Sequence, residues 1–191
     1  MKDAACIILS GGLSERMGSH KALLSYADQE NFLQHIIRVY STVGINNIVV
    51  VLNPNIDFDQ LSIDNSPVTT VINSFPERGR LYSLQLGLSV ASSVSHCFIQ
   101  NIDNPFVNND LLNQLYNFRS EADCIKPSYL DQGGHPILIS SKIVSHILDL
   151  KSYTSTLREV LSNFNNKKIQ ANKDCVVNMN SMNDYHTYFS L

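Results

Sequence analysis

The sequence predicts an α/β fold in which a single doubly wound, mostly parallel sheet carries helices on both faces. Short runs rich in valine and isoleucine alternate along the chain with longer segments whose apolar residues recur at helical spacing. Continuous apolar strands separated by helices are typical of a parallel sheet that is covered on both sides. Because no repeat, low-complexity tract or linker divides the 191 residues, we expect one domain over residues 1–191.

Seven short apolar runs are the expected strands. The first lies close to the start of the chain and is apolar throughout, and the others follow at intervals that leave room for a helix or a loop. The expected strands are Ala4–Leu9, Asn47–Leu52, Val68–Ile72, His96–Ile102, Asp123–Ser128, Ile137–Ile139 and Cys175–Met179.

Five segments between these strands have the spacing of amphipathic helices. Gly44 closes the first of them, and Asn109 or Asp110 is placed to cap the third. Thr156 followed by Glu159 has the spacing of a capping box. The expected helices are Phe32–Val43, Leu81–Ala91, Asp110–Phe118, Lys142–Leu150 and Thr156–Phe164.

The composition is that of an ordinary folded globule, with 43% hydrophobic and 16% charged residues. The formal net charge of −3 argues against a nucleic acid as the main partner. The apolar run after Met1 is too short for a signal peptide, and no stretch has the length of a membrane span. The four cysteines are far apart and are expected to be buried thiols. We expect a cytoplasmic protein, a monomer or a weak homodimer, with no membrane partner.

The functional site is expected at the carboxyl ends of the strands. In open α/β sheets, ligands bind where the loops that follow the strands meet the N-termini of helices. Five such loops hold most of the unusual polar residues: Ser10–Lys21, Asn73–Arg80, Asp103–Phe106, Leu130–Pro136 and Asn180–Asp184.

The first of these loops is rich in glycine and carries two basic side chains. Gly11 and Gly12 let the backbone turn sharply and present amide groups, which bind phosphate oxygens. Arg16 and Lys21 add positive charge that suits a polyphosphate. The spacing matches neither the P-loop nor the dinucleotide-binding fingerprint. The loop therefore predicts phosphate binding of another kind.

The same loop resembles the signature L-[AS]-[GA]-G-x-S-x-R-M-G-x-x-K of the molybdopterin nucleotidyltransferase-like family. The resemblance implies the Rossmann-like fold of the nucleotide-diphospho-sugar transferases, which methylerythritol-phosphate cytidylyltransferases share. It implies that the loop wraps a nucleoside triphosphate, while Arg16 and Lys21 act as catalytic residues at the α-phosphate and the departing pyrophosphate. The nucleotide-binding residues that it implies here are Leu9, Ser10, Gly11, Gly12, Ser14 and Gly18.

Asp103, in the segment N-I-D-N-P, is the expected metal ligand. Mg²⁺ is usually bound by one or two carboxylates together with phosphate oxygens and water, and a carboxylate at the end of a strand suits this role. The family has a similar D-x-P motif, so the resemblance implies a catalytic, Mg²⁺-binding Asp103. A turn-capping role is the structural alternative.

The late segment V-N-M-N-S-M-N-D-Y resembles the family motif [ND]-x-[ND]-T-P-E-D-[YL]. The resemblance implies Asn180 as a second Mg²⁺ ligand, with Asn178 as the alternative. Ser181 and Met182 replace the Thr-Pro of the motif, and Asn183 replaces its Glu. A neutral amide binds Mg²⁺ less strongly than a carboxylate does.

Two further segments resemble parts of the family. The segment R-G-R-L-Y-S-L-Q-L-G-L resembles G-x-x-S-L-x-x-G-L, which implies that Gly79, Ser83 and Leu84 line the base pocket, with Arg78 and Arg80 at its rim. Close packing is the simplest explanation of Gly87 within a helix. The segment G-G-H-P resembles G-H-P-[VI]-L of the cytidylyl branch, which implies that His135 lies on the acceptor side, although a loop-packing role is the alternative.

The expected reaction is attack by an acceptor phosphate on the α-phosphate of CTP or GTP, with release of pyrophosphate and with Mg²⁺ as cofactor. The resemblance favours molybdopterin, or the molybdenum cofactor that contains it, as acceptor. Gly11-Gly12 favours the guanylyl branch, whereas the G-H-P and S-L segments favour the cytidylyl branch. The alternatives are a sugar- or alcohol-phosphate nucleotidyltransferase and a nucleotide-binding regulator without activity.

Overall fold

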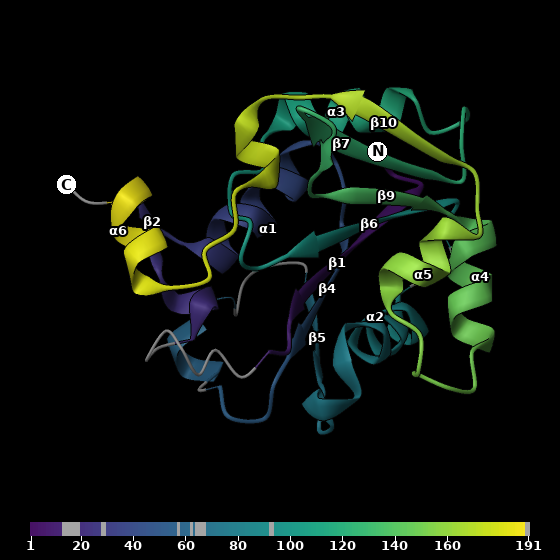
Figure 1. Ribbon diagram of the computed structural model, residues 1–191. Coiled ribbons are helices and arrows are strands. Elements are labelled where there is room, and N and C mark those ends of the chain that lie inside the picture. The colour runs from purple at the N-terminus through teal and green to yellow at the C-terminus, as the bar shows by residue number, and fades with distance from the viewer. Residues whose placement is uncertain are drawn as a thin grey trace.

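The computed structural model shows one sheet with helices on both faces (Figure 1). Its strand order is β10-β7-β9-β6-β1-β4-β5, with β8 paired to β7 beside this path. The strands are β1 (Ala4–Ser10), β4 (Asn47–Leu52), β5 (Val68–Ile72), β6 (His96–Asn101), β7 (Cys124–Tyr129), β8 (Gln132–Gly133), β9 (Ile137–Ser140) and β10 (Asn166–Gln170), and β2 (Ser25–Ala27) and β3 (Glu30–Asn31) form a separate pair. The structure describes residues 1–12, 20–27, 30–56, 58–61, 63, 68–91 and 94–189.

The sheet is mostly parallel, as the sequence predicts. β1 pairs in parallel with β4 and β6, β4 with β5, and β7 with β10. β9 runs antiparallel between β6 and β7, and the short strand β8 is also antiparallel to β7. The chain reaches β9 from β7 through a tight turn at Leu130 and Asp131, whose φ angles are 46° and 64°. A connection this short reverses the direction of the chain, because a parallel crossover needs a dozen residues or more.

The expected strand at Cys175–Met179 is wrong. That segment begins with the short 3-10 helix η5 (Lys173–Val176), and the last strand of the sheet is β10, which was not expected. β10 is an edge strand in which only Ile169 is buried, so it lacks a continuous apolar run. Cys175 and Met179 are apolar because they are buried under the loop after β6, not because they pair in the sheet.

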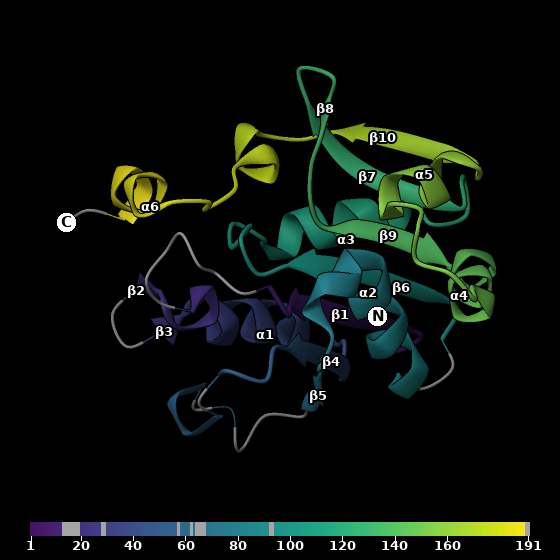
Figure 2. The ribbon, with the colours of Figure 1, turned by 60° about the horizontal axis from the view of Figure 1, so that its bottom comes forward.

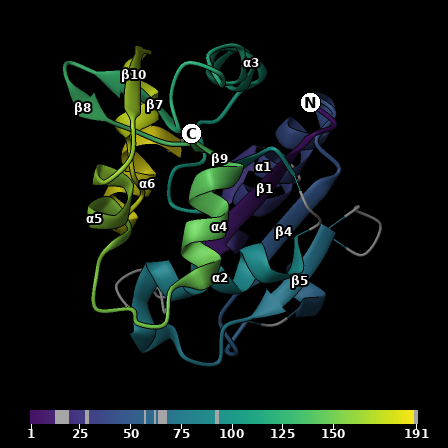
Figure 3. The ribbon, with the colours of Figure 1, turned by 90° about the vertical axis from the view of Figure 1, so that its right-hand side faces the viewer.

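The helices cover the two faces of the sheet (Figure 3). Cys6 and Ile8 of β1 pack on the face covered by α1 and α3, whereas Ile7 and Leu9 pack on the face covered by α2, α4 and α5. Every residue of β1 is buried, as expected for the central strand of a covered sheet. The helices are α1 (Phe32–Thr42), α2 (Gly79–Val90), α3 (Asn109–Asn117), α4 (Ser141–Asp149), α5 (Leu157–Ser162) and α6 (Met182–Phe189).

The helix ends follow local capping rules. Gly44, with φ 81°, ends α1, and Thr156 with Glu159 forms the predicted capping box of α5. The cap of α3 is Asn108, whose side chain accepts from the amide of Leu111; the prediction of Asn109 or Asp110 is wrong by one or two residues.

The last helix, α6, lies beside β2 at the left of Figure 1. The Tyr185 hydroxyl donates to the carbonyl of Ser25 at 3.0 Å, and Phe189 packs against Tyr26 with ring centroids 5.5 Å apart. Among the described residues, no helix has the length and apolar character needed to cross a bilayer. The four cysteines are buried and free, as predicted.

Gly87 confirms the expected close packing of α2 on the sheet. A Cβ at this position would lie 2.5 Å from Cγ2 of Ile7 and 2.9 Å from Cγ2 of Val51. Both methyl groups belong to buried strand residues. The missing side chain therefore lets α2 approach β1 and β4.

We predict that Gly87→Ala lowers the free energy of unfolding by about 1–2 kcal/mol, because overpacking outweighs the helix propensity that alanine gains. Urea denaturation measures this change. Ser89→Ala on the exposed side of the same helix is the control and should stay within about 0.5 kcal/mol of the unchanged protein. Equal or higher stability of Gly87→Ala would contradict the close packing.

Candidate active site

Lys21 and Asp103 meet at the carboxyl edge of the two central strands. Lys21 begins the short helix η2 (Lys21–Leu23) after the glycine-rich loop, and Asp103 lies two residues beyond the end of β6. Lys21 Nζ is 3.7 Å from Asp103 Oδ2, and the two side chains are 13% and 19% exposed. This separation is longer than a direct hydrogen bond, so the pair holds opposite charges close together without locking them.

One carboxylate oxygen of Asp103 is left without a partner. Oδ1 is buried and has no hydrogen-bond partner among the described residues, as is also true of the amide oxygens of Asn101 and Asn104. The backbone of Asp103 is fixed, since its carbonyl accepts the amide of Met179 at 2.7 Å. Within the part of the chain that the structure describes, no group of three or more His, Cys, Asp or Glu side chains gathers for a metal.

The ends of the first loop are joined by Asn53, which follows β4 and is 2% exposed. Its amide Nδ2 donates to the carbonyl of Gly12 at 2.8 Å and lies 3.0 Å from Nε2 of His20. Burial lowers the pKa of His20, which favours the neutral ring. Leu9, Ser10 and Gly11 are buried and Gly12 is exposed. The predicted site residues Ser14, Arg16 and Gly18 lie outside the described residues.

A second buried asparagine, Asn73, connects β5 to the first turn of α2. Its Nδ2 donates to the hydroxyl of Ser83 at 2.9 Å, and this hydroxyl donates to the carbonyl of Gly79 at 3.3 Å. A Cβ on Gly11 would lie 3.4 Å from the Ser83 hydroxyl, so the start of the glycine-rich loop rests against this network. Gly79, with φ 81°, adopts a conformation that favours glycine.

The segment predicted to form the base pocket divides into buried and exposed residues. Leu84 is completely buried in the core beneath α2. Arg78 and Arg80 are exposed, in agreement with rim positions. The guanidinium of Arg78 lies 4.4 Å from the ring centre of Phe75 and 5.1 Å from that of Tyr82. Any contact of Leu84 with a base would therefore be made by its backbone.

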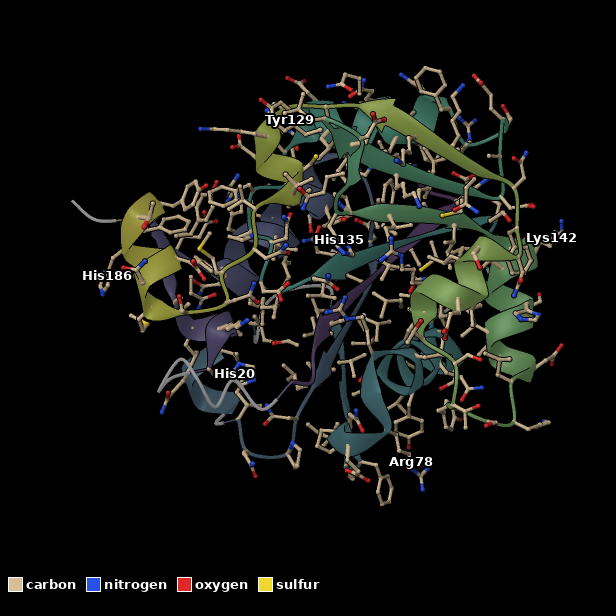
Figure 4. The ribbon with its side chains drawn as sticks, in the orientation of Figure 1. His20, Arg78, Tyr129, His135, Lys142 and His186 are labelled. Carbon is tan, nitrogen blue, oxygen red and sulfur yellow. The ribbon has the colours of Figure 1, made fainter. Side chains whose placement is uncertain are left out.

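His135 lies near the middle of Figure 4, where β9 begins beside the end of β6. Its Nε2 is 2.9 Å from Nδ2 of Asn101, so the asparagine amide donates to an unprotonated ring nitrogen. Burial lowers the pKa of His135 to about 4, and the positive charge of Arg80 contributes to the shift. The ring is neutral near pH 7 and is a hydrogen-bonding group rather than an effective proton acceptor.

Asn180 is exposed, and its backbone is held by Asp184. The carboxylate Oδ2 of Asp184 accepts the amides of Asn180 and Ser181 at 3.0 and 2.9 Å and the Ser181 hydroxyl at 2.9 Å. The hydrogen bond from Ser181 is the main cause of the lowered pKa of Asp184, and the charge of Lys21 lowers it further. The structure thus brings the turn at Asn180 within electrostatic reach of Lys21.

The asparagine and aspartate partners at this edge were not predicted. Asn53, Asn73 and Asn101 each end or directly follow an apolar strand and are almost completely buried. The recurrence of an asparagine at the end of one apolar run after another could have indicated these residues from the sequence. Asp184 stands in the late motif, but its role as an anchor for Asn180 depends on the turn that only the structure shows.

A glycine-rich loop and a lysine–aspartate pair at the carboxyl edge of such a sheet are features of a nucleotide-binding α/β protein. Residues 6–169 match the family model described as the MobA-like NTP transferase domain, and the chain belongs to this family.

Two curated relatives match nearly the whole chain. The molybdenum cofactor cytidylyltransferase of Escherichia coli (strain K12) is 24% identical over 182 residues, which cover 95% of this chain and 93% of the relative. The probable molybdenum cofactor guanylyltransferase of Bacillus mycoides (strain KBAB4) is 26% identical over 200 aligned positions, which cover 97% and 95%.

Solved structures share the fold. Rv0371c from Mycobacterium tuberculosis H37Rv superposes with a TM-score of 0.81 at 19% identity over the whole of both chains. A structure of the same protein in complex with manganese has a TM-score of 0.79 at 18% identity and covers 100% of this chain and 99% of that one.

The lowered pKa of His135 predicts a pH-dependent stability. Between the unfolded pKa of about 6.5 and the folded pKa of about 4, the unfolded chain binds more protons, so the contribution of neutral His135 is complete above pH 6.5 and is lost as the pH falls. From pH 7.5 to pH 5.0, the unchanged protein should lose about 2 kcal/mol more unfolding free energy than His135→Gln.

Urea denaturation at the two pH values measures this difference. His146→Gln removes an exposed histidine and is the matched control, which should follow the unchanged protein. The same pH dependence in His135→Gln as in the unchanged protein would show that His135 is not held neutral by the fold.

Proposed function

We propose that residues 1–191 form one catalytic domain that transfers a nucleoside monophosphate from CTP or GTP to a phosphorylated acceptor of the molybdopterin class and releases pyrophosphate. The observation that carries the proposal is the Lys21–Asp103 pair at the carboxyl ends of β1 and β6, directly beside the glycine-rich loop. The names of the two curated relatives, a molybdenum cofactor cytidylyltransferase and a probable guanylyltransferase, support the acceptor and the choice between the two bases.

The residues at this edge fit a divalent cation. The buried Oδ1 of Asp103, which has no hydrogen-bond partner among the described residues, is a suitable ligand for Mg²⁺. Mg²⁺ usually takes one or two carboxylates and completes its coordination with phosphate oxygens and water. Asp103 and the amide oxygen of Asn180 would hold the ion, and the related structure with manganese supports a divalent metal. When bound, Mg²⁺ supplies positive charge to the phosphate oxygens of the nucleotide.

The protein groups contribute charge neutralisation and positioning. Lys21, which is largely buried beside Asp103, places an ammonium group where negative charge develops on the phosphates. The loop backbone, held at Gly12 by Asn53 and packed at Gly11 against Asn73 and Ser83, would orient the triphosphate. An acceptor phosphate is already ionised near neutral pH and needs no general base, which agrees with a neutral His135.

A thermal-shift screen tests the proposal and chooses the base. CTP, GTP, ATP and UTP are each added with and without MgCl₂. Either CTP or GTP should raise the melting temperature by about 5 °C or more at 100 times its Kd, and only with Mg²⁺. No shift with any nucleotide would refute the proposal. Pyrophosphate release with molybdopterin, compared with sugar phosphates, then identifies the acceptor.

We predict that Lys21→Ala lowers kcat/KM for pyrophosphate release on the order of 10²–10³-fold, because a charge aimed at the transition state is lost. The control is Lys142→Ala. Lys142 is also paired with an aspartate, Asp123, at 3.0 Å, but it lies at the right-hand edge of Figure 4, away from His135 and His20. A loss of less than threefold in Lys21→Ala, or an equal loss in both variants, would remove Lys21 from the reaction.

A further inference from the structure

Asn104, the residue after Asp103, is buried against the late segment of the chain. It is 1% exposed. Its Nδ2 lies 2.5 Å from the carbonyl of Val177, 3.3 Å from that of Cys175 and 3.4 Å from that of Asp174. Two amide hydrogens are thus directed at three carbonyls of one segment. A single side chain therefore bonds to backbone carbonyls that lie outside the sheet.

The position of Asn104 is itself fixed from the core. The amide of Gln100, which is completely buried, donates to the carbonyls of Asn101 and Asn104, both at 2.8 Å. The oxygen of the same amide accepts the hydroxyl of buried Tyr40 at 3.1 Å. A continuous set of buried hydrogen bonds therefore leads from α1 through β6 to Asn104.

The late segment joins the site through the same loop. The amide of Met179 donates to the carbonyl of Asp103 at 2.7 Å, and Asn180 is the next residue. Four residues before Met179, the segment also contacts the loop that leads into β9, since the amide of His135 donates to the carbonyl of Cys175 at 2.8 Å. The loop that carries Asp103 and the segment that carries Asn180 are thus held together by Asn104 and Met179.

We propose that Asn104 is a positioning residue that keeps Asn180 beside Asp103 and so completes the metal and nucleotide site. The effect of Asn104 on metal binding rests on the proposed function. Its effect on the position of residues 174–181 does not. A role limited to stability would lower the melting temperature without a selective effect on the segment 174–181 or on metal binding. A positioning role changes both.

The first experiment is amide hydrogen exchange by mass spectrometry, without nucleotide or metal. Asn104→Ala should speed the exchange of peptides that cover residues 174–181, including the Met179 amide, on the order of tenfold or more, while peptides of β1 stay protected. Asn166→Ala is the matched control, because Nδ2 of Asn166 also donates to two carbonyls, those of Leu161 and Phe164, at 2.8 and 2.6 Å. Asn166 lies where β10 begins, far along the strand from the site. Unchanged exchange at 174–181 in Asn104→Ala would overturn the proposal.

The second experiment is a titration with Mn²⁺ of the protein bound to a non-reactive analogue of the preferred nucleotide, followed by electron paramagnetic resonance. Asn104→Ala should raise the Mn²⁺ concentration at half-saturation on the order of tenfold, whereas Asn166→Ala should leave it unchanged. Equal Mn²⁺ binding by both variants would contradict the positioning role.

Asn104→Ser, which keeps one short donor, carries both measurements if Asn104→Ala does not fold, with effects in the same direction. If the unchanged protein binds no nucleotide, the proposed function fails, and the exchange experiment still decides whether Asn104 holds the segment.

Discussion

Where parallel strands end at a covered edge, the loops that follow carry backbone groups that need partners, because few of them reach water. In this protein, buried asparagines meet that requirement. Asn53 holds the carbonyl of Gly12, Asn73 holds Ser83 against Gly79, and Asn104 holds the carbonyls of the late segment. An asparagine amide suits the task, since it combines two donors and an acceptor on a short side chain that carries no charge. The same bonds also fix the backbone at Gly12 and in the segment that leads to Asn180.

The charged groups of the site are few and depend on this neutral framework. Lys21 and Asp103 are 3.7 Å apart, and both lie on segments whose backbone is fixed by amides rather than by other ions. A framework of neutral groups places this pair of opposite charges at the edge of the sheet, where a triphosphate and a cation would interact with them. His135 belongs to the framework, as its lowered pKa of about 4 keeps it uncharged.

Features that depend on a local run of residues could be predicted from the sequence. Contacts between residues far apart in the chain could not. Apolar runs predicted β1, β4 and β5 closely, and the glycines and Asp103 were recognisable within motifs. β10 was not recognised, because an edge strand with two lysines and a single buried residue, Ile169, has no apolar run. The asparagine roles were hidden because their partners lie far away along the chain, 41 residues for Asn53 and Gly12 and 73 for Asn104 and Val177. The residue pattern of Cys175–Met179 does not distinguish a strand from an irregular buried segment whose carbonyls bond to the Asn104 side chain.

The reversed direction of β9 has a consequence for how such a protein can diversify. Both ends of the connection between β7 and β9 lie at the carboxyl edge, where the β7–β8 hairpin projects from the sheet in Figure 2. Its length can change without a shift in the register of any parallel strand, because loop closure costs little per added residue. The half of the sheet built on β1, β4 and β5 is entirely parallel, so the hairpin is the place in the other half where the chain turns back directly. Insertions in this hairpin would change the carboxyl edge of the sheet without moving the parallel strands.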